Sequence, residues 1–125
     1  AGTFNDEQRR LAEAQRAAYQ AALQAMKPGV PAAEPDAAAR RALDKYGMRD
    51  LFAHHTGHGI GFRYHEAIPS VHPDSTGVLQ AGMITSLEPG LYGETFGYRV
   101  EDNVLITSAG AELLCHSPRW PGLEA

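Results

Sequence analysis

Apolar residues in the first part of the chain are spaced as on one face of a helix. Between Asn5 and Met26 they recur at intervals of three or four residues, while charged residues fill the positions between them, which predicts one amphipathic helix. Asn5 is a suitable N-cap, and Gln8 three residues later can complete a capping box. This stretch should therefore fold as one helix with one buried face.

A second helical segment follows a short break. The break is Lys27–Pro31, which contains prolines that lack an amide hydrogen and a glycine that tolerates positive φ. Apolar spacing then predicts a helix from about Pro35 to Tyr46. Gly47 is expected to end this helix in the left-handed conformation.

Beyond the second helix the pattern changes from helical to alternating. Met83–Glu88 and Tyr98–Thr107 are rich in Ile, Val, Thr and Leu and are predicted as strands, with Glu112–Cys115 as a third strand after a turn at 108–110. We expect an α+β fold in which two helices pack on one face of an antiparallel sheet. No repeats or low-complexity linkers divide residues 1–125, which we interpret as a single domain.

Composition narrows the classes of partner. A chain of 125 residues with 43% hydrophobic composition allows one core rather than two. The net charge of -4 gives no basic surface for nucleic acid, and no apolar run approaches the length that crosses a bilayer, so neither is an expected partner. The single Cys115 cannot form an intramolecular disulfide. We therefore predict a cytoplasmic protein in which Cys115 packs in a strand core and has no functional role.

Histidines concentrate in one stretch that glycines punctuate. Five of the six lie between His54 and His72, and His58 stands within Gly-His-Gly-Ile-Gly, where the backbone can bend and approach a ligand closely. Histidine is the commonest transition-metal ligand, and it is the only side chain that titrates unperturbed near neutral pH. The cluster indicates a reaction site, although a single histidine in such a loop is as readily structural. We interpret His55 and His72 as surface or packing residues.

Two glutamates occupy strand positions where a carboxylate is costly. Period-two alternation puts Glu88 on the same face as Ser86. It also puts Glu101 with Arg99 and turns Asp102 to the opposite face. An isolated glutamate at a strand end ordinarily faces solvent, whereas a buried one needs a cation or hydrogen bonds. Together with the histidine of the Gly-His-Gly motif, these carboxylates form a donor set that suits Mn, Co, Zn or Fe.

Four motifs then follow one another in a recognisable order. They are Thr-Gly-His-Gly-Ile-Gly at 56–61, His65-Glu66 with Pro69, Leu-Glu-Pro-Gly-Leu-Tyr at 87–92, and Gly-Tyr-Arg-Val-Glu-Asp at 97–102. This order resembles the C-terminal half of the pita-bread metallopeptidases, which include methionine aminopeptidase, Xaa-Pro aminopeptidase and prolidase. The similarity runs from about Gly2 to Leu114. The strings Glu-Pro-Gly-x-Tyr and Arg-x-Glu-Asp are most similar to the Xaa-Pro aminopeptidase and prolidase branch.

The resemblance implies a fold and a metal centre. The fold is the C-terminal half of a curved pita-bread sheet, and the substrate of the complete enzyme is a peptide with an Xaa-Pro or N-terminal bond. His58, Glu88 and Glu101 are implied as ligands of a two-metal centre, most readily of manganese, with Glu101 bridging. Two neighbouring metal ions can activate water and polarise the carbonyl that is cleaved.

The resemblance also implies roles for residues around the metal. His65 would stabilise or protonate the reacting amide, and His54 would position the substrate. Arg99 would hold the ligating carboxylates in place. The alternatives are a hydrogen-bonded loop histidine at position 65 and a plain cross-strand ion pair at position 99.

The chain departs from this family in one respect. Complete members supply two aspartate ligands from strands before the first matched helix, whereas Asp6, Asp36 and Asp44 here lie on the predicted helices. We expect a fragment of a longer protein that holds one ion or none and has little or no peptidase activity. The missing strands should leave an exposed sheet edge that favours a homo-oligomer or another association.

Two other functions remain open from the sequence. One is a non-catalytic binding module, because a fold does not fix a function. Such a module has no physical need for the three metal donors and His65, which argues against it. The other is a metal-independent hydrolase of the creatinase type, in which a histidine acts without metal.

Overall fold

The computed structural model describes residues 3–120 and 123. Its first helix, α1 (Asp6–Ala25), carries the predicted cap. The Asn5 side chain accepts a hydrogen bond from the Gln8 amide at 2.8 Å, and the Gln8 side chain accepts one from the Asn5 amide at 3.0 Å. Each bond satisfies an amide that the first helical turn leaves without a partner. The capping box is therefore confirmed.

The second helix, α2 (Glu34–Asp44), lies within two residues of its predicted bounds. Gly47 has a φ of +65°, which is the left-handed conformation expected at the end of this helix. Asp36 in the first turn is buried and forms an ion pair of 2.9 Å with Arg40 one turn later. A short 3-10 helix, η1 (Arg49–Leu51), follows and leads to the sheet.

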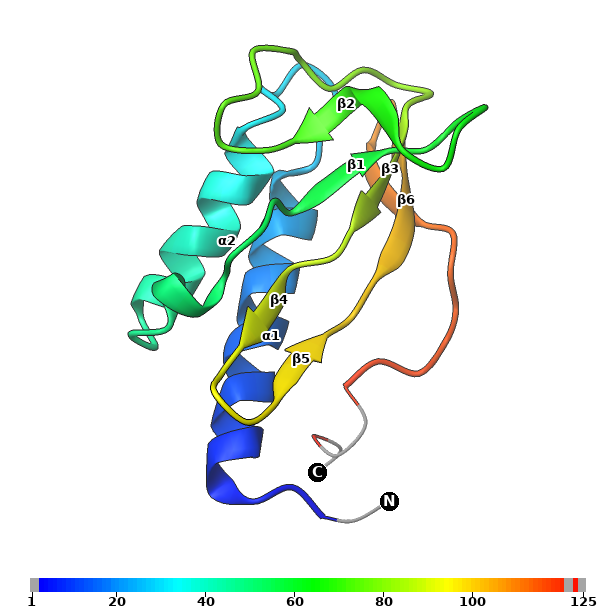
Figure 1. The fold of residues 1–125 in the computed structure, drawn as a ribbon. Coiled ribbons are helices and arrows are strands. Elements are labelled where there is room, and N and C mark those ends of the chain that lie inside the picture. Colours follow the sequence, from blue (N-terminus) through cyan, green and yellow to red (C-terminus); the bar gives the residue numbers. More distant parts are fainter. Residues whose placement is uncertain (1–2, 121–122, 124–125) are drawn as a thin grey trace.

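The strands form a five-stranded antiparallel sheet in the order β2-β1-β3-β6-β7, and β4 and β5 form a separate two-stranded ladder. Both helices lie behind one face of the sheet (Figure 1). The predicted α+β architecture is confirmed. The strand bounds are β1 Gly57–Gly59, β2 Glu66–Val71, β3 Ile84–Leu87, β4 Gly90–Tyr92, β5 Gly97–Arg99, β6 Asp102–Thr107 and β7 Gly110–Leu113.

One predicted strand is two strands in the structure. Tyr98–Thr107 divides into β5 and β6, with Val100 and Glu101 between them. The interruption faces Pro89, which has no amide hydrogen to donate to a ladder. The strands β1, β2 and β4 were not predicted, because they are short and rich in glycine or proline and lack clear alternation.

The prediction for the last strand was also wrong in its bounds. Thr107 pairs directly with Gly110, so β7 begins two residues earlier than expected, within the predicted turn, and ends at Leu113. Cys115 therefore follows the strand and does not lie in its core. Its sulfur accepts a hydrogen bond of 3.4 Å from the Asn103 amide.

The core lies between the helices and the covered face of the sheet. Ala14, Ala18 and Ala22 of α1 are fully buried, and their small side chains allow the helix to approach its neighbours closely. The sheet contributes Leu87, Val104 and Ile106, which are also fully buried. Predicted apolar positions of α1 thus form part of the core. Among the described residues, no helix is long and apolar enough to span a membrane.

Candidate metal centre

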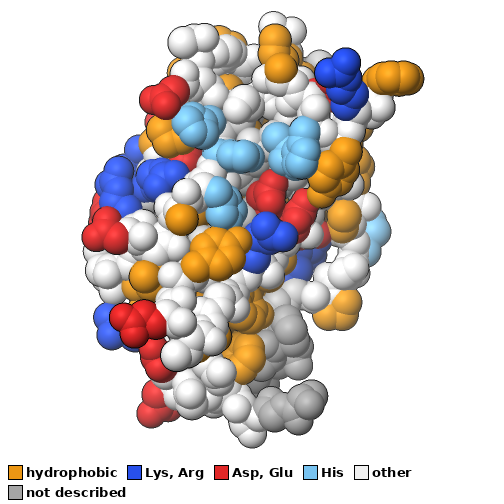
Figure 2. All heavy atoms as spheres, viewed as in Figure 1, with side chains coloured by type: hydrophobic (Ala, Val, Ile, Leu, Met, Phe, Trp, Pro, Cys, Tyr) orange, Lys and Arg blue, Asp and Glu red, His pale blue; other side chains and the backbone are white. Residues whose placement is uncertain are grey.

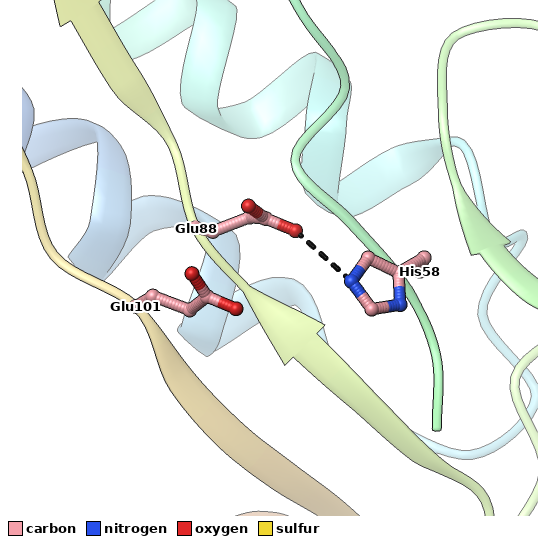
Figure 3. A group of neighbouring side chains, drawn as sticks. All are labelled: His58, Glu88 and Glu101. Carbon is pink, nitrogen blue, oxygen red and sulfur yellow. Dashed lines mark ion pairs between the residues drawn. The ribbon is translucent and has the colours of Figure 1, made fainter. Parts of the chain in front are cut away.

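Glu88 and Glu101 lie directly opposite each other in an interruption of the sheet. The β3–β6 ladder ends where Leu87 pairs with Asp102, and the β4–β5 ladder resumes in the same register after two residues on each strand. The two glutamates occupy equivalent positions in this interruption. Their side chains point toward the same space (Figure 3). Period-two alternation predicted these directions, and Asp102 faces the opposite side, toward α1.

Like charges directly opposite across two strands repel each other, so this arrangement needs compensation. Arg99 supplies part of it. Its guanidinium lies 3.6 Å from a carboxylate oxygen of Glu88 and 3.9 Å from one of Glu101. The Arg99 side chain is 48% exposed, so solvent weakens both contacts. The pair of carboxylates therefore retains a strong preference for a further cation.

His58 reaches these carboxylates from β1, the strand next to β3. Glycines on both sides of it allow close packing. A Cβ at Gly57 would collide with the backbone carbonyl of Ser86, and a Cβ at Gly59 would lie 2.6 Å from the carbonyl oxygen of Ile68. These glycines therefore allow β1 to fit closely between its two neighbouring strands. The close approach of this backbone to a ligand stays a prediction.

The imidazole of His58 presents a lone pair to the carboxylates. Its Nδ1 lies 3.0 Å from the carbonyl oxygen of Gly59, which only accepts hydrogen bonds, so Nδ1 carries the hydrogen. Nε2 lies 3.3 Å from Oε1 of Glu88, and in the neutral imidazole it is an acceptor (Figure 3). Two acceptors at this distance need a proton or a metal cation between them. The carbonyl contact is the usual way in which proteins orient a metal-binding histidine.

One donor atom from each of these three residues lies within 4.8 Å of the others. His58 and Glu88 are buried, and Glu101 is exposed. One imidazole nitrogen and carboxylate oxygens fit Mn, Co, Zn or Fe, and three protein donors leave coordination positions for water or substrate. The described residues contain no other group of three or more such donors in this arrangement.

Ser86 connects two of the donors and was not singled out as a site residue from the sequence. Its hydroxyl donates to Oε1 of Glu88 at 3.0 Å and accepts from the His58 amide at 2.9 Å. The Glu88 amide donates to the Thr56 carbonyl at 2.8 Å. The strand alternation that put Ser86 on the face of Glu88 is the signal that predicts this role.

His65 lies beside the three donors. Its ring centroid is 3.9 Å from that of His58, and its side chain is exposed on the loop between β1 and β2. On this face of the molecule, histidine side chains gather around acidic ones (Figure 2). The structure therefore brings His65 to the candidate centre and leaves it accessible to a ligand.

His54 also lies close to this region, but its ring nitrogens have internal partners. Nδ1 donates to the His55 carbonyl at 2.7 Å, and Nε2 accepts from the Tyr92 hydroxyl at 2.9 Å. Gly90 leaves space for both rings, because a Cβ there would lie within 3.0 Å of each. Tyr92 is the last residue of the Leu-Glu-Pro-Gly-Leu-Tyr motif, and the sequence did not predict a role for it. Only the structure shows its contact with His54.

The remaining histidines extend the cluster away from the carboxylates. The His55 ring centroid lies 6.4 Å from that of His58 and 6.0 Å from that of His72. Burial lowers the pKa of the His55 imidazole, and the charge of Glu88 opposes this effect. His55 is thus a packing residue between the centre and His72, in agreement with its interpretation from the sequence.

Comparison with known protein families gives one match that covers most of the chain. The sequence model of metallopeptidase family M24 matches residues 1–108. This range contains His58, Glu88 and Glu101. It also contains His54, His65 and Arg99.

Curated proteins give matches at similar coverage. The chain is 42% identical over 119 residues to an Xaa-Pro dipeptidase of Lactobacillus helveticus, and this match covers 94% of the chain and 32% of the relative. It is 40% identical over 119 residues to an Xaa-Pro dipeptidase of Pyrococcus furiosus, covering 94% of the chain and 34% of the relative. The chain therefore spans about a third of the length of these relatives.

Solved structures agree with the sequence matches. Dipeptidase PepE from Mycobacterium ulcerans superposes with a TM-score of 0.90 at 39% identity, covering 94% of this chain and 32% of that one. The prolidase from Pyrococcus furiosus gives a TM-score of 0.90 at 40% identity, covering 94% of this chain and 35% of that one. The chain thus has the fold of the C-terminal part of these proteins.

Proposed function

The chain belongs to metallopeptidase family M24, and from this membership we propose that it is the C-terminal portion of a metal-dependent peptidase that cleaves Xaa-Pro or N-terminal peptide bonds. The relatives named Xaa-Pro dipeptidase support this substrate class. Because the chain spans about a third of their length, the activity is proposed for the protein of which such a chain is a part.

The observation that carries the proposal is the opposition of Glu88 and Glu101 in the break between two ladders, with the lone pair of His58 directed at Glu88. Two facing carboxylates repel each other, and a cation held between them and Nε2 of His58 would remove this cost. A divalent cation held by these donors would polarise a peptide carbonyl and lower the pKa of water. Manganese is our first choice, with cobalt, zinc and iron as alternatives.

The surrounding side chains would orient the substrate and move its proton. His65 is exposed beside His58, so a peptide at the centre can reach its imidazole, which would stabilise or protonate the reacting amide. His54 would help to position the substrate, and the hydrogen bond with the Tyr92 hydroxyl would hold its ring in place. Arg99 contacts both carboxylates and would keep them ionised and correctly oriented.

We further propose that the centre takes two metal ions and is incomplete in this chain alone. Three donors leave two adjacent ions with too few protein ligands, so additional carboxylates must come from outside the described group. The resemblance to the pita-bread metallopeptidases implies that Glu101 would be the bridging ligand. By this argument the isolated chain binds one ion weakly and cleaves peptides poorly or not at all.

Metal content tests the donor set directly. The purified chain is dialysed to equilibrium against Mn²⁺, and bound metal is obtained from the difference in manganese concentration between the two compartments. We expect bound manganese in the unsubstituted chain and its loss in Glu88→Gln, since an amide oxygen is a much weaker ligand than a carboxylate. Glu112→Gln is the matched control, because Glu112 is an exposed glutamate on β7 outside the donor group.

The outcomes separate this proposal from the two other functions. Absence of bound metal in the unsubstituted chain at any practical Mn²⁺ concentration would refute the metal centre and favour a binding module or a metal-independent hydrolase. An assay of the same chain against Xaa-Pro dipeptides with added Mn²⁺ tests whether the metal centre needs ligands beyond those of this chain. Turnover comparable to an ordinary peptidase would refute the claim that further ligands are required.

A further inference from the structure

The segment that follows β7 runs beside β6 and β5 (Figure 1), and its last residues contact Asp102 and residue Gln15 of α1. Two residues of α1 that are one helical turn apart meet two consecutive residues of this segment. We call these four residues the rear clamp: Gln15, Tyr19, Arg119 and Trp120. Gln15 and Tyr19 are buried, and the side chain of Arg119 is 20% exposed.

One half of the rear clamp holds Asp102, the residue that follows Glu101. Arg119 donates to its carboxylate from Nε at 2.6 Å and from Nη2 at 2.9 Å, which is a bidentate contact. The Tyr19 hydroxyl donates to the same carboxylate. Arg119 also donates to the Cys115 carbonyl at 2.6 Å, which fixes the course of its own segment.

The other half of the rear clamp holds Pro89, the residue that follows Glu88. Gln15 donates from Nε2 to the Pro89 carbonyl at 2.8 Å, and its Oε1 accepts from the Trp120 indole at 2.8 Å. The rings of Trp120 and Tyr19 pack edge to face with centroids 5.3 Å apart. This ring contact joins the two halves into one unit.

The position of these contacts has a physical reason. The β3–β6 ladder stops at Leu87 and Asp102, and β4–β5 resumes only after the two glutamates. Ladder pairing does not extend across this interruption, where the two carboxylates must be set at a fixed separation. The rear clamp supplies hydrogen bonds at the two positions immediately after the glutamates, and from the opposite face of the sheet.

We infer that the rear clamp sets the separation of the Glu88 and Glu101 carboxylates, so that Gln15, Tyr19, Arg119 and Trp120 are positioning residues for the metal centre. This inference rests on the metal centre proposed above. Arg119 and Trp120 lie beyond residue 108, where the match to the family model ends, so half of the rear clamp belongs to a part of the chain outside that match.

Co²⁺ binding tests this role, because its visible absorption reports both affinity and coordination geometry. Arg119→Lys keeps the charge but removes the bidentate contact, and Trp120→Phe keeps an aromatic ring but removes the indole donor. Arg49→Lys is the matched control, since Arg49 pairs with Asp44 at 3.0 Å on the exposed surface. Each protein is titrated with Co²⁺ at a temperature where circular dichroism shows it fully folded.

We expect Arg119→Lys to raise the Kd for Co²⁺ about tenfold and to change its absorption spectrum, at the lower end of the effect of residues that orient metal ligands. Trp120→Phe should raise the Kd less, in the same direction, and Arg49→Lys should leave it unchanged. Amide hydrogen exchange without metal provides a second measurement. Exchange at Glu88 and Glu101 should become faster in Arg119→Lys and should not change in Arg49→Lys.

Two results would overturn the inference in different ways. If Arg119→Lys lowers the Tm but leaves the Kd, the Co²⁺ spectrum and the exchange rates unchanged, the rear clamp contributes only to stability. If the unsubstituted chain binds no Co²⁺, the metal centre itself fails, and the role of the rear clamp in it fails as well.

Discussion

Replacement of Glu101 by Gln should change stability in opposite directions with and without metal. Without metal, the substitution removes the repulsion between facing carboxylates, which is worth up to about 1 kcal/mol across a strand pair. It also removes the contact with Arg99 at 3.9 Å, which is worth about half as much or less because the arginine is half exposed. The variant should therefore be more stable than the unsubstituted chain by about 0.5 kcal/mol, or a Tm rise of about 2 °C.

With metal, the order should reverse. A ligand at one hundred times its Kd stabilises the folded state by about 2.7 kcal/mol, which for a chain of this size raises the Tm by roughly 10 °C. Only the unsubstituted chain should gain this stabilisation, because Glu101→Gln lacks one of the three donors.

Thermal unfolding in a chelator and in excess Mn²⁺, at low ionic strength, measures both effects. Glu112→Gln serves as the control, since it removes an exposed carboxylate without altering the donor group. A Glu101→Gln variant that is clearly less stable in the chelator would refute the argument about opposed charges. A variant that gains as much from Mn²⁺ as the unsubstituted chain would show that Glu101 is not a ligand.

Three further predictions follow from the packing and the open edges. Gly57→Ala should lower the free energy of unfolding in urea by about 3 kcal/mol because of its collision with Ser86, whereas Gly77→Ala, which meets no atom within 4 Å, should change it by less than about 0.5 kcal/mol. Burial, and then the hydrogen bond to Asp102, raises the pKa of Tyr19, so its contribution to stability is complete below the ordinary pKa of 10.0 and is lost above it. The fall in stability between pH 10 and 11 should be shallower in Tyr19→Phe, and an equal slope in both proteins would contradict this assignment. The edge strands β2 and β7 should pair between molecules, which sedimentation velocity would reveal as larger species at higher concentration, and a clean monomer throughout would count against it.

Local interactions explain which parts of the fold could be predicted from the sequence. The capping box at Asn5 and the left-handed Gly47 depend on residues within a few positions of each other, and both predictions are confirmed. The alternation that put Ser86 with Glu88 is equally local, and their hydrogen bond agrees with it. The boundaries of the strands depended instead on their neighbours, so the division of Tyr98–Thr107 at Glu101 was not predicted.

The three donor residues of the candidate centre were predicted from the sequence, but the contacts that hold them in place were not. The motifs indicated His58, Glu88 and Glu101, and the structure brings these three side chains together. It also adds the contact of Ser86 with two of them and the contact of Tyr92 with His54. The contacts of Ser86 with His58 and of Tyr92 with His54 join residues that are 28 and 38 positions apart, which no local pattern can specify.

The sequence by itself determined the helices, the alternating faces and the types of donor atom, because those properties follow from periodicity and side-chain chemistry. Only the tertiary structure decided that Glu88 and Glu101 are opposite each other in a gap between two ladders, since register is a property of paired strands. It also decided that Arg119, near the end of the described residues, reaches Asp102 beside one of those glutamates. Contacts between distant segments arise when the chain packs around a shared core, and no single segment contains the information that sets them.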